Sequence, residues 1–169
     1  MREDEEDMKT LILMRHARKE KAKKNRKKER SLGKRGQKDA LLMAGALLEK
    51  ELNPQVILSS TALAARQTAA TAVEKFNFTG EVLNLDSLKD GEVKDYIKAL
   101  QAVDDAADRV LLVGHTPALR ALIKRLTKVD QRFPTGAVAH LSLPIQHWLE
   151  LSKKTECDLI EFYAPKDFS

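Results

Sequence analysis

The chain alternates short hydrophobic runs with longer segments in which hydrophobic residues recur every three or four positions. A short continuous run predicts a buried strand, and the wider spacing predicts a helix with one apolar face. The clearest run is 109–113 (RVLLV), and the clearest helix is 34–51. The apolar face expected for that helix is formed by Ala40, Leu41, Ala44, Leu47 and Leu48.

Applied to the whole chain, the pattern predicts strands that alternate with helices. The strands are expected at 9–14, 56–58, 82–85 and 109–113, and the helices at 34–51, 62–76, 92–103 and 117–126. The segment 59–61 and Thr116 are expected to cap two of these helices, and Pro117 suits a first helical turn. Three further strand-like segments follow, at 138–143, 147–151 and 158–163.

This order of elements predicts an α/β fold. Alternating strands and helices indicate a mostly parallel sheet with helices on both faces, and three late strands separated by turns indicate antiparallel pairing at one edge. We therefore expect a three-layer sandwich with a mostly parallel mixed sheet and antiparallel C-terminal edge strands.

Length and composition favour one domain. The 169 residues are 43% hydrophobic and 33% charged, which suits a single domain over 8–169. The acidic residues 1–7 have no place in the pattern, and we expect them to be disordered. No apolar stretch approaches the roughly 18–20 residues that cross a bilayer. These features predict a cytoplasmic protein that does not enter a membrane, and the lone Cys157 has no partner for a disulfide.

The net charge of +5 is unevenly distributed. The basic run 19–30 (KEKAKKNRKKER) holds eight basic and two acidic residues. Such a run suits contact with an acidic protein or a nucleic acid, or a solvated loop. It contains no aromatic residue on which a base could stack, so nucleic acid is the less favoured partner.

Polar residues follow three of the predicted strands. They are Arg15-His16, the segment 59–61 and the segment 114–116 (GHT). Ligands bind at the carboxyl ends of parallel strands, where helix N-termini favour an anion such as phosphate. A guanidinium matches phosphate oxygens, and an imidazole can attack phosphorus. His16 is therefore the candidate nucleophile.

Each of these short motifs is weak evidence when taken alone, because Arg-His and Gly-His dipeptides are common. Their order along the chain and their positions after buried strands make the combination informative. The remaining histidines, His140 and His147, are expected at a sheet surface or edge. No group of residues has the spacing of a metal site.

The chain resembles the histidine phosphatase superfamily, in particular its SixA-like branch. The resemblance rests on LILMRHAR, LGKRGQKDA, LSSTALAARQTA, LLVGHTPAL and FPTGAVAHL, and it covers nearly the whole chain from Met8. It implies an α/β fold, His16 as the phosphorylated residue, Arg15 as a phosphate clamp and His115 as a second imidazole beside the phosphoryl group. It implies no metal and no cofactor.

The sequence departs from the family at a phosphate ligand. The third motif usually carries an arginine where this chain has Ala64, which predicts reduced activity. Arg66 is the nearest arginine on the same helix, although a step of two residues turns it by about 200°. The loop after RHAR is basic here, so Arg18 or a lysine of the basic run is another candidate for the missing charge.

No proton donor to a leaving group stands out, although Asp90 and Glu92 are candidates. A phosphohistidine can lose its ring nitrogen with little proton help, whereas an alkyl ester needs a positioned acid. The expected activity is therefore hydrolysis of phosphohistidine, or a similar phosphoramidate, on a protein or small substrate, through a covalent intermediate on His16. Two alternatives remain open, namely a weakly active or inactive phosphate-binding module and a basic adaptor for an acidic protein or nucleic acid.

Overall fold

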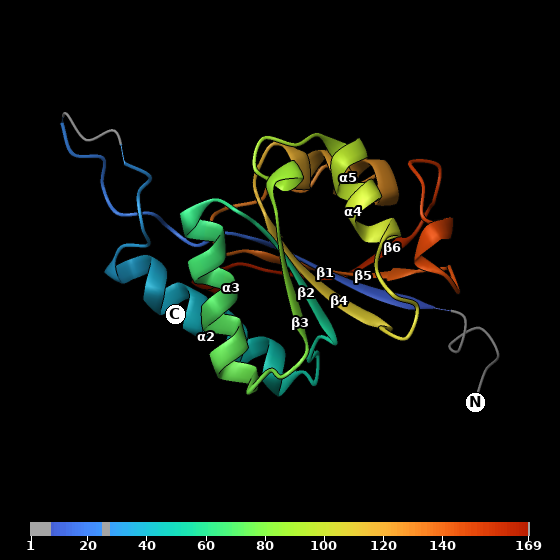
Figure 1. Ribbon diagram of the computed structural model, residues 1–169, viewed down its shortest axis with the longest axis horizontal. Coiled ribbons are helices and arrows are strands. Elements are labelled where there is room, and N and C mark those ends of the chain that lie inside the picture. The colour runs from blue at the N-terminus through green and yellow to red at the C-terminus, as the bar shows by residue number, and fades with distance from the viewer. Residues whose placement is uncertain (1–7, 25–27, 169) are drawn as a thin grey trace.

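A single mixed sheet of six strands forms the centre of the protein (Figure 1). The computed structural model describes residues 8–24 and 28–168, so the expectation for residues 1–7 lies outside the described residues. The strand order is β3-β2-β4-β1-β5-β6. The strands are β1 (Lys9–Arg15), β2 (Val56–Ser60), β3 (Glu81–Leu85), β4 (Arg109–Gly114), β5 (Val138–Leu143) and β6 (Asp158–Tyr163).

Helices cover both faces of this sheet, so the expected three-layer α/β sandwich is confirmed. They are α2 (Lys34–Glu49), α3 (Leu63–Phe76), α4 (Val93–Gln101) and α5 (Ala118–Thr127). In Figure 1, α2 and α3 lie on one side of the sheet, and α4 and α5 lie on the other. Two separate hydrophobic clusters correspond to these two interfaces.

The strand β1 shows why the short hydrophobic runs become central strands. Leu11 and Leu13 pack in the cluster under α4 and α5, whereas Ile12 and Met14 pack in the cluster under α2 and α3. Side chains alternate between the faces of a strand, so a strand covered on both faces must be hydrophobic at every position. This requirement explains the unbroken run in β1.

Parallel pairing brings the predicted strand ends together. The strand β4 is parallel to both β1 and β2. In the register of these pairs, Arg15 is the partner of Gly114, and Ser59 is the partner of Val113. The polar residues that follow the three strands therefore meet at one edge of the sheet. As predicted, the antiparallel pairs are at the C-terminal end, between β1 and β5 and between β5 and β6.

The prediction of a strand at 147–151 is wrong. A short 3-10 turn at Trp148–Glu150 occupies the segment, and it is held by hydrogen bonds from the Trp148 backbone N–H to Asp105 and from its indole N–H to the Ala107 carbonyl. His147 consequently lies in a turn, ion-paired with Asp105, and not in the sheet. The segment resembles a strand in sequence because a turn that is anchored by buried side chains, here Trp148 and Leu151, is also hydrophobic.

Two smaller expectations also differ from the structure. On α2, Leu41 is 52% exposed and Met43 is fully buried, so the apolar face is rotated from the one predicted. The helices α3 and α5 begin after Ala62 and Pro117, and neither of these N-cap residues makes a side-chain capping bond. Before α3, the Ser60 hydroxyl accepts the backbone N–H of Ala62, and the Thr61 hydroxyl donates to Asp86.

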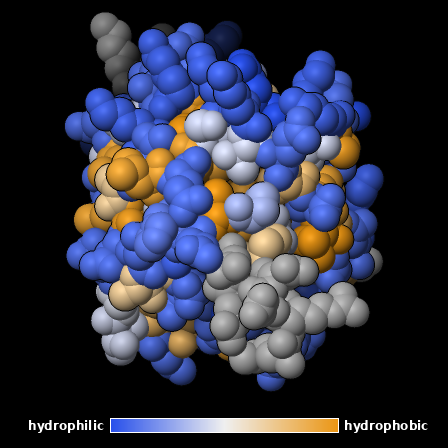
Figure 2. All heavy atoms as spheres, turned by 90° about the vertical axis from the view of Figure 1, so that its right-hand side faces the viewer, coloured by the Kyte–Doolittle hydropathy of each residue, from blue (hydrophilic) through white to orange (hydrophobic). Residues whose placement is uncertain are grey.

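The described helices are all too short or too polar to cross a membrane. Figure 2 shows the end of the molecule that forms the right-hand side of Figure 1, near the start of β1. Hydrophilic side chains there separate several smaller hydrophobic patches.

We predict that Trp148→Ala lowers the free energy of unfolding by about 3–5 kcal/mol, because it removes a large buried ring and leaves the Ala107 carbonyl without its donor. The neighbouring Leu149, which is 75% exposed, is the matched control. Leu149→Ala should stay within about 0.5 kcal/mol of the wild type. Urea denaturation measures both, and equal effects would contradict the buried-anchor assignment.

Candidate active site

His16 lies directly after β1 and is almost fully buried, with 6% of its surface exposed. Its Nδ1 is 2.8 Å from the carbonyl oxygen of Ala17. A carbonyl only accepts hydrogen bonds, so Nδ1 must carry the proton and Nε2 keeps a free lone pair. This tautomer presents Nε2 as the atom able to attack an electrophile.

The His16 ring is neutral over most of the pH range. Burial lowers its pKa to about 4; the bond to Ala17 opposes the shift, and the charges of His115, Lys19 and Arg15 add to it. Since an unprotonated imidazole is the nucleophilic form, this environment keeps His16 ready for attack well below neutral pH.

His115 lies beside His16, and their ring centroids are 5.0 Å apart. Its Nε2 is 2.7 Å from the hydroxyl oxygen of Ser60, which also accepts a hydrogen bond from the backbone N–H of Ala62. Burial is the main cause that lowers the pKa of His115, followed by the positive charge of Lys19. Side chains at the C-terminal ends of β1, β2 and β4 thus form one group of residues in contact.

Tyr96 fixes the backbone of His115. The buried Tyr96 hydroxyl accepts the backbone N–H of His115 and donates to the carbonyl of Leu88, each at 3.1 Å. It also lies so close to Gly114 that a Cβ there would be 2.5 Å from the hydroxyl oxygen. Gly114 therefore allows the close approach that positions His115. Sequence reasoning did not identify Tyr96, because an amphipathic helix gives no sign that one of its buried residues reaches a distant strand end.

Arg15 is anchored next to the histidine pair. One of its guanidinium nitrogens donates to the Phe133 carbonyl at 3.0 Å, and its Nε is buried without a partner among the described residues. Burial lowers its pKa from the usual value. A buried N–H without an acceptor favours an anion at this position, as expected of a phosphate clamp.

Thr68 ties the loop after His16 to α3. Its hydroxyl accepts the backbone N–H of Ala17 and donates to the Ala64 carbonyl, at 3.0 and 2.8 Å. Ala64, only 1% exposed, packs with Ala17 in a small cluster. Ala64 thus lies on the side of α3 that faces the loop after His16. Thr68 was also missed from the sequence, because a threonine inside a helix gives no sign of this contact.

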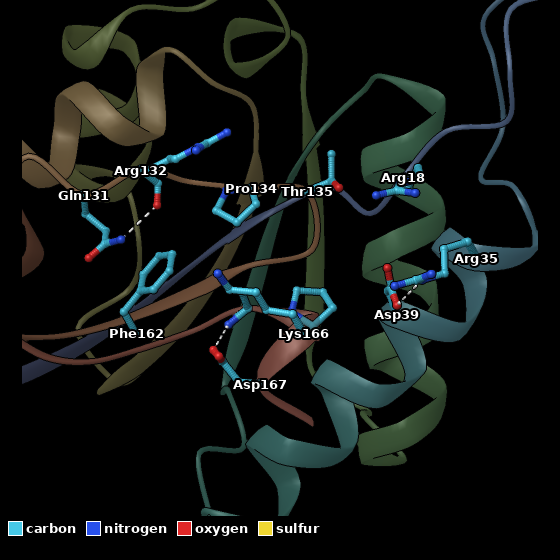
Figure 3. A pocket seen from close by; sticks show the side chains of 12 residues that line it. Arg18, Arg35, Asp39, Gln131, Arg132, Pro134, Thr135, Phe162, Lys166 and Asp167 are labelled. Atoms are coloured by element: carbon cyan, nitrogen blue, oxygen red, sulfur yellow. Dashed lines mark hydrogen bonds and ion pairs between the residues drawn. The ribbon is translucent and has the colours of Figure 1, made fainter. Parts of the chain in front are cut away.

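The two arginines proposed as phosphate ligands lie apart from each other. Arg18 is exposed and lines a pocket of about 540 Å³ with residues of α2 and the C-terminal segment (Figure 3). Arg66 is exposed on α3, where its Nε donates to the Thr61 carbonyl at 2.8 Å. Neither has a hydrogen bond or ion pair to His16 or His115 among the described residues. Their assignment as phosphate ligands stays a prediction.

The candidate proton donors also differ in their surroundings. The negative charge of Asp90 is one of the influences on His115, where it opposes the pKa decrease caused mainly by burial and then by Lys19. Glu92 forms the capping box of α4 together with Asp95. Asp90 is therefore the better placed of the two to act near the histidines. Among the described residues, no cluster of three or more side chains is arranged to hold a metal ion.

This arrangement defines a class of protein. A neutral buried histidine, a second imidazole and an arginine with a free buried N–H meet at the carboxyl ends of parallel strands, an arrangement able to bind an anion and to attack it with a nucleophile. The sequence model of the histidine phosphatase superfamily (branch 1) matches residues 11–99. The chain belongs to this superfamily, and its fold and family support phosphatase activity.

The structure is similar to solved structures of SixA proteins. The structure classed as phosphohistidine phosphatase SixA from Nakamurella multipartitia matches with a TM-score of 0.81 and 28% identity, over 94% of this chain and 96% of that one. The corresponding Agrobacterium tumefaciens structure gives a TM-score of 0.79 and 26% identity, over 93% and 98%. An uncharacterised protein of Mycobacterium leprae is 26% identical over 148 residues, 82% of this chain and 88% of that one.

We predict that the His16 ring titrates with a midpoint near pH 4, because burial disfavours its charged form. Protonation then occurs only as the pH falls well below the usual histidine pKa of about 6.5. NMR titration of the ring protons, with the resonance assigned by its loss in His16→Ala, measures this directly. A midpoint between pH 6 and 7 would contradict the buried, neutral state.

We predict that Gly114→Ala lowers stability by about 1–3 kcal/mol through overpacking, since its Cβ would meet the Tyr96 ring and hydroxyl. Gly45→Ala is the matched control: it lies within α2, and its Cβ would be an ordinary 3.5 Å from the Lys75 side chain. That control should gain about 0.5–1 kcal/mol from the helix preference of alanine. Thermal denaturation compares the two, and a neutral Gly114→Ala would exclude the close approach.

Proposed function

We propose that this protein hydrolyses phosphohistidine, or a comparable phosphoramidate, through a covalent phosphohistidine on His16. The observation that carries the proposal is the His16 tautomer: its proton is held on Nδ1 by the Ala17 carbonyl, which leaves Nε2 free beside His115 and Arg15. The likeness to SixA structures above 25% identity supports the same substrate class.

In the first step, the Nε2 lone pair of His16 attacks phosphorus, and the P–N bond of the substrate breaks. The ring nitrogen of the substrate takes the electrons of that bond. Because the second nitrogen of the same ring carries a proton, the leaving group is a neutral imidazole. In the second step, water attacks the phosphoryl group on His16, and the new P–N bond breaks with its electrons returning to Nε2. The water protons stay on the inorganic phosphate that leaves. Arg15 and His115 stabilise the oxygens that gain negative charge in both steps.

The surroundings of the site support a phosphorylated protein as substrate. The pocket that Arg18 lines also contains Arg35 and Arg132, which come from separate segments (Figure 3). Asp39 pairs with Arg35, whereas Arg18 and Arg132 form no ion pair among the described residues. The pocket adjoins the site, because its Thr135 precedes Gly136, whose N–H binds the carbonyls of Arg15 and His16. An acidic protein surface around the phosphohistidine complements these charges.

The alternative of an inactive phosphate-binding module is favoured by one observation, the buried Ala64 in the first turn of α3. A module of this kind would bind phosphate at the same site but would not turn over. The two functions therefore differ in the covalent step and not in binding.

We predict that wild-type protein incubated with ³²P-phosphoramidate acquires an acid-labile, base-stable label and releases inorganic phosphate. His16→Ala should acquire no label and lose at least about 10³ in rate, because the nucleophile is absent. His147→Ala is the matched control, because this histidine is exposed and contacts Asp105 instead of the residues of the site. The control variant should be labelled like the wild type.

Labelling retained in His16→Ala would overturn the proposed intermediate. Phosphate binding without label or turnover in the wild type would identify the module instead. Equal turnover of an alkyl phosphate ester would contradict the preference for a P–N bond.

A further inference from the structure

Lys19 is held in a fixed position three residues after His16. It forms a β-bridge with Leu32, and the next residue, Glu20, donates its backbone N–H to the Ser31 carbonyl at 2.8 Å. On the other side, the backbone of Arg18 accepts the N–H of Gly33 at 3.2 Å. The backbone of Lys19 is thus secured on both sides, and its side chain is half-buried.

Lys19 lines a hollow of about 200 Å³ at the start of α3, which it shares with residues 62–64 and with Lys28, Glu29 and Arg30 of the basic run. Ala62 is also the residue whose N–H binds Ser60, the hydroxyl partner of His115. Lys19 therefore lies between the loop after His16 and the first turn of α3. The hollow also reaches Ala64, which is buried against Ala17.

The positive charge of Lys19 acts on both imidazoles. At His115 and at His16, burial is the largest cause of the lowered pKa, and among the cationic side chains Lys19 contributes more than Arg15 at each ring. Lys19 forms no ion pair with a carboxylate of the described residues. The nearby Glu29 pairs with Lys89 at 2.9 Å and contacts the N–H of Leu63. The Lys19 charge is therefore available to an anion.

The two arginines considered from the sequence are less suited to this role. Arg66 is already bonded to the Thr61 carbonyl, and Arg18 faces the larger pocket on the other side of the loop. At both His16 and His115 their charges affect the pKa less than those of Lys19 and Arg15 do. Consecutive residues of an extended segment point in opposite directions, which separates Arg18 from Lys19.

We infer that the Lys19 ammonium is a phosphate-binding group of this site, which contacts the oxygens of the phosphoryl group on His16 from the side of the first turn of α3. This inference rests on the proposed function for the identity of the phosphoryl group. It assigns the second cation of the site, besides Arg15, to the start of the basic run. An ammonium is a compact charge that can follow the phosphoryl group as it moves between substrate and His16.

The test compares Lys19→Met with Lys21→Met, which removes the same charge from an exposed position two residues further along the run. Inorganic phosphate binding is measured by isothermal titration, and phosphoramidate turnover is measured separately. Lys19→Met should weaken phosphate binding by about tenfold to a hundredfold, as loss of a charge-assisted hydrogen bond does. It should lower kcat by about 10²-fold, whereas Lys21→Met should change both by less than about twofold.

A second comparison uses Lys19→Arg, which keeps a positive charge at the same position. This variant should retain most of the phosphate affinity that Lys19→Met loses, because a guanidinium also donates hydrogen bonds to phosphate oxygens. A loss as large as that of Lys19→Met would contradict the role of the charge. Circular dichroism confirms that each variant is folded.

Equal effects of Lys19→Met and Lys21→Met would overturn the inference and would show that only the general charge of the run matters. Unchanged phosphate binding in Lys19→Met, with His16→Ala still inactive, would also overturn it while leaving the proposed function intact. Normal activity of His16→Ala would refute the proposed function, whereas the phosphate titration would still decide the role of Lys19.

Discussion

The parallel pairing of β4 with both β1 and β2 is the constraint on which the site depends. Parallel strands end at the same edge, so hydrogen bonds along the ladders bring Arg15, Gly114 and Ser59 into neighbouring positions. The backbone N–H of His16 donates to the Gly114 carbonyl, which continues the pairing of β1 with β4 by one residue. The site is thus an extension of the sheet, and its precision comes from buried backbone hydrogen bonds and not from flexible side chains.

Burial then gives this edge its chemical character. The same helices that cover the sheet exclude water from His16 and His115, which lowers the pKa of both imidazoles. A neutral pair can approach to 5.0 Å without the repulsion that two charged rings would have. Arg15 and Lys19 add positive charge around the pair, which favours an anion at this position. Tyr96 and Thr68 hold the backbone on either side, so the pair keeps its geometry.

Ala64, where the family resemblance leads us to expect an arginine, lies beside the loop that follows His16. The loop packs on the first turn of α3 through Ala17 and Ala64, which belong to one cluster. Lys19 of the same loop shares a hollow with this turn. A positive charge of the loop therefore lies beside the position at which the helix has none.

The sequence by itself determined the class of fold, and it predicted which residues meet at the strand ends. Unbroken hydrophobic runs such as β1 must be covered on both faces, and the polar residues after them then have one place to meet. His16, Arg15 and His115 were predicted as site residues from this pattern and from family resemblance. Only the tertiary structure decided the rest. The turn at Trp148 looked like a strand because a buried anchor and a strand residue have the same hydrophobicity, and the distant bonds to Asp105 and Ala107 distinguish them. Tyr96, Thr68 and Lys19 likewise depend on which side of each segment faces the strand ends. Sequence spacing within one element does not determine that direction, because it is set by packing between elements far apart in the chain.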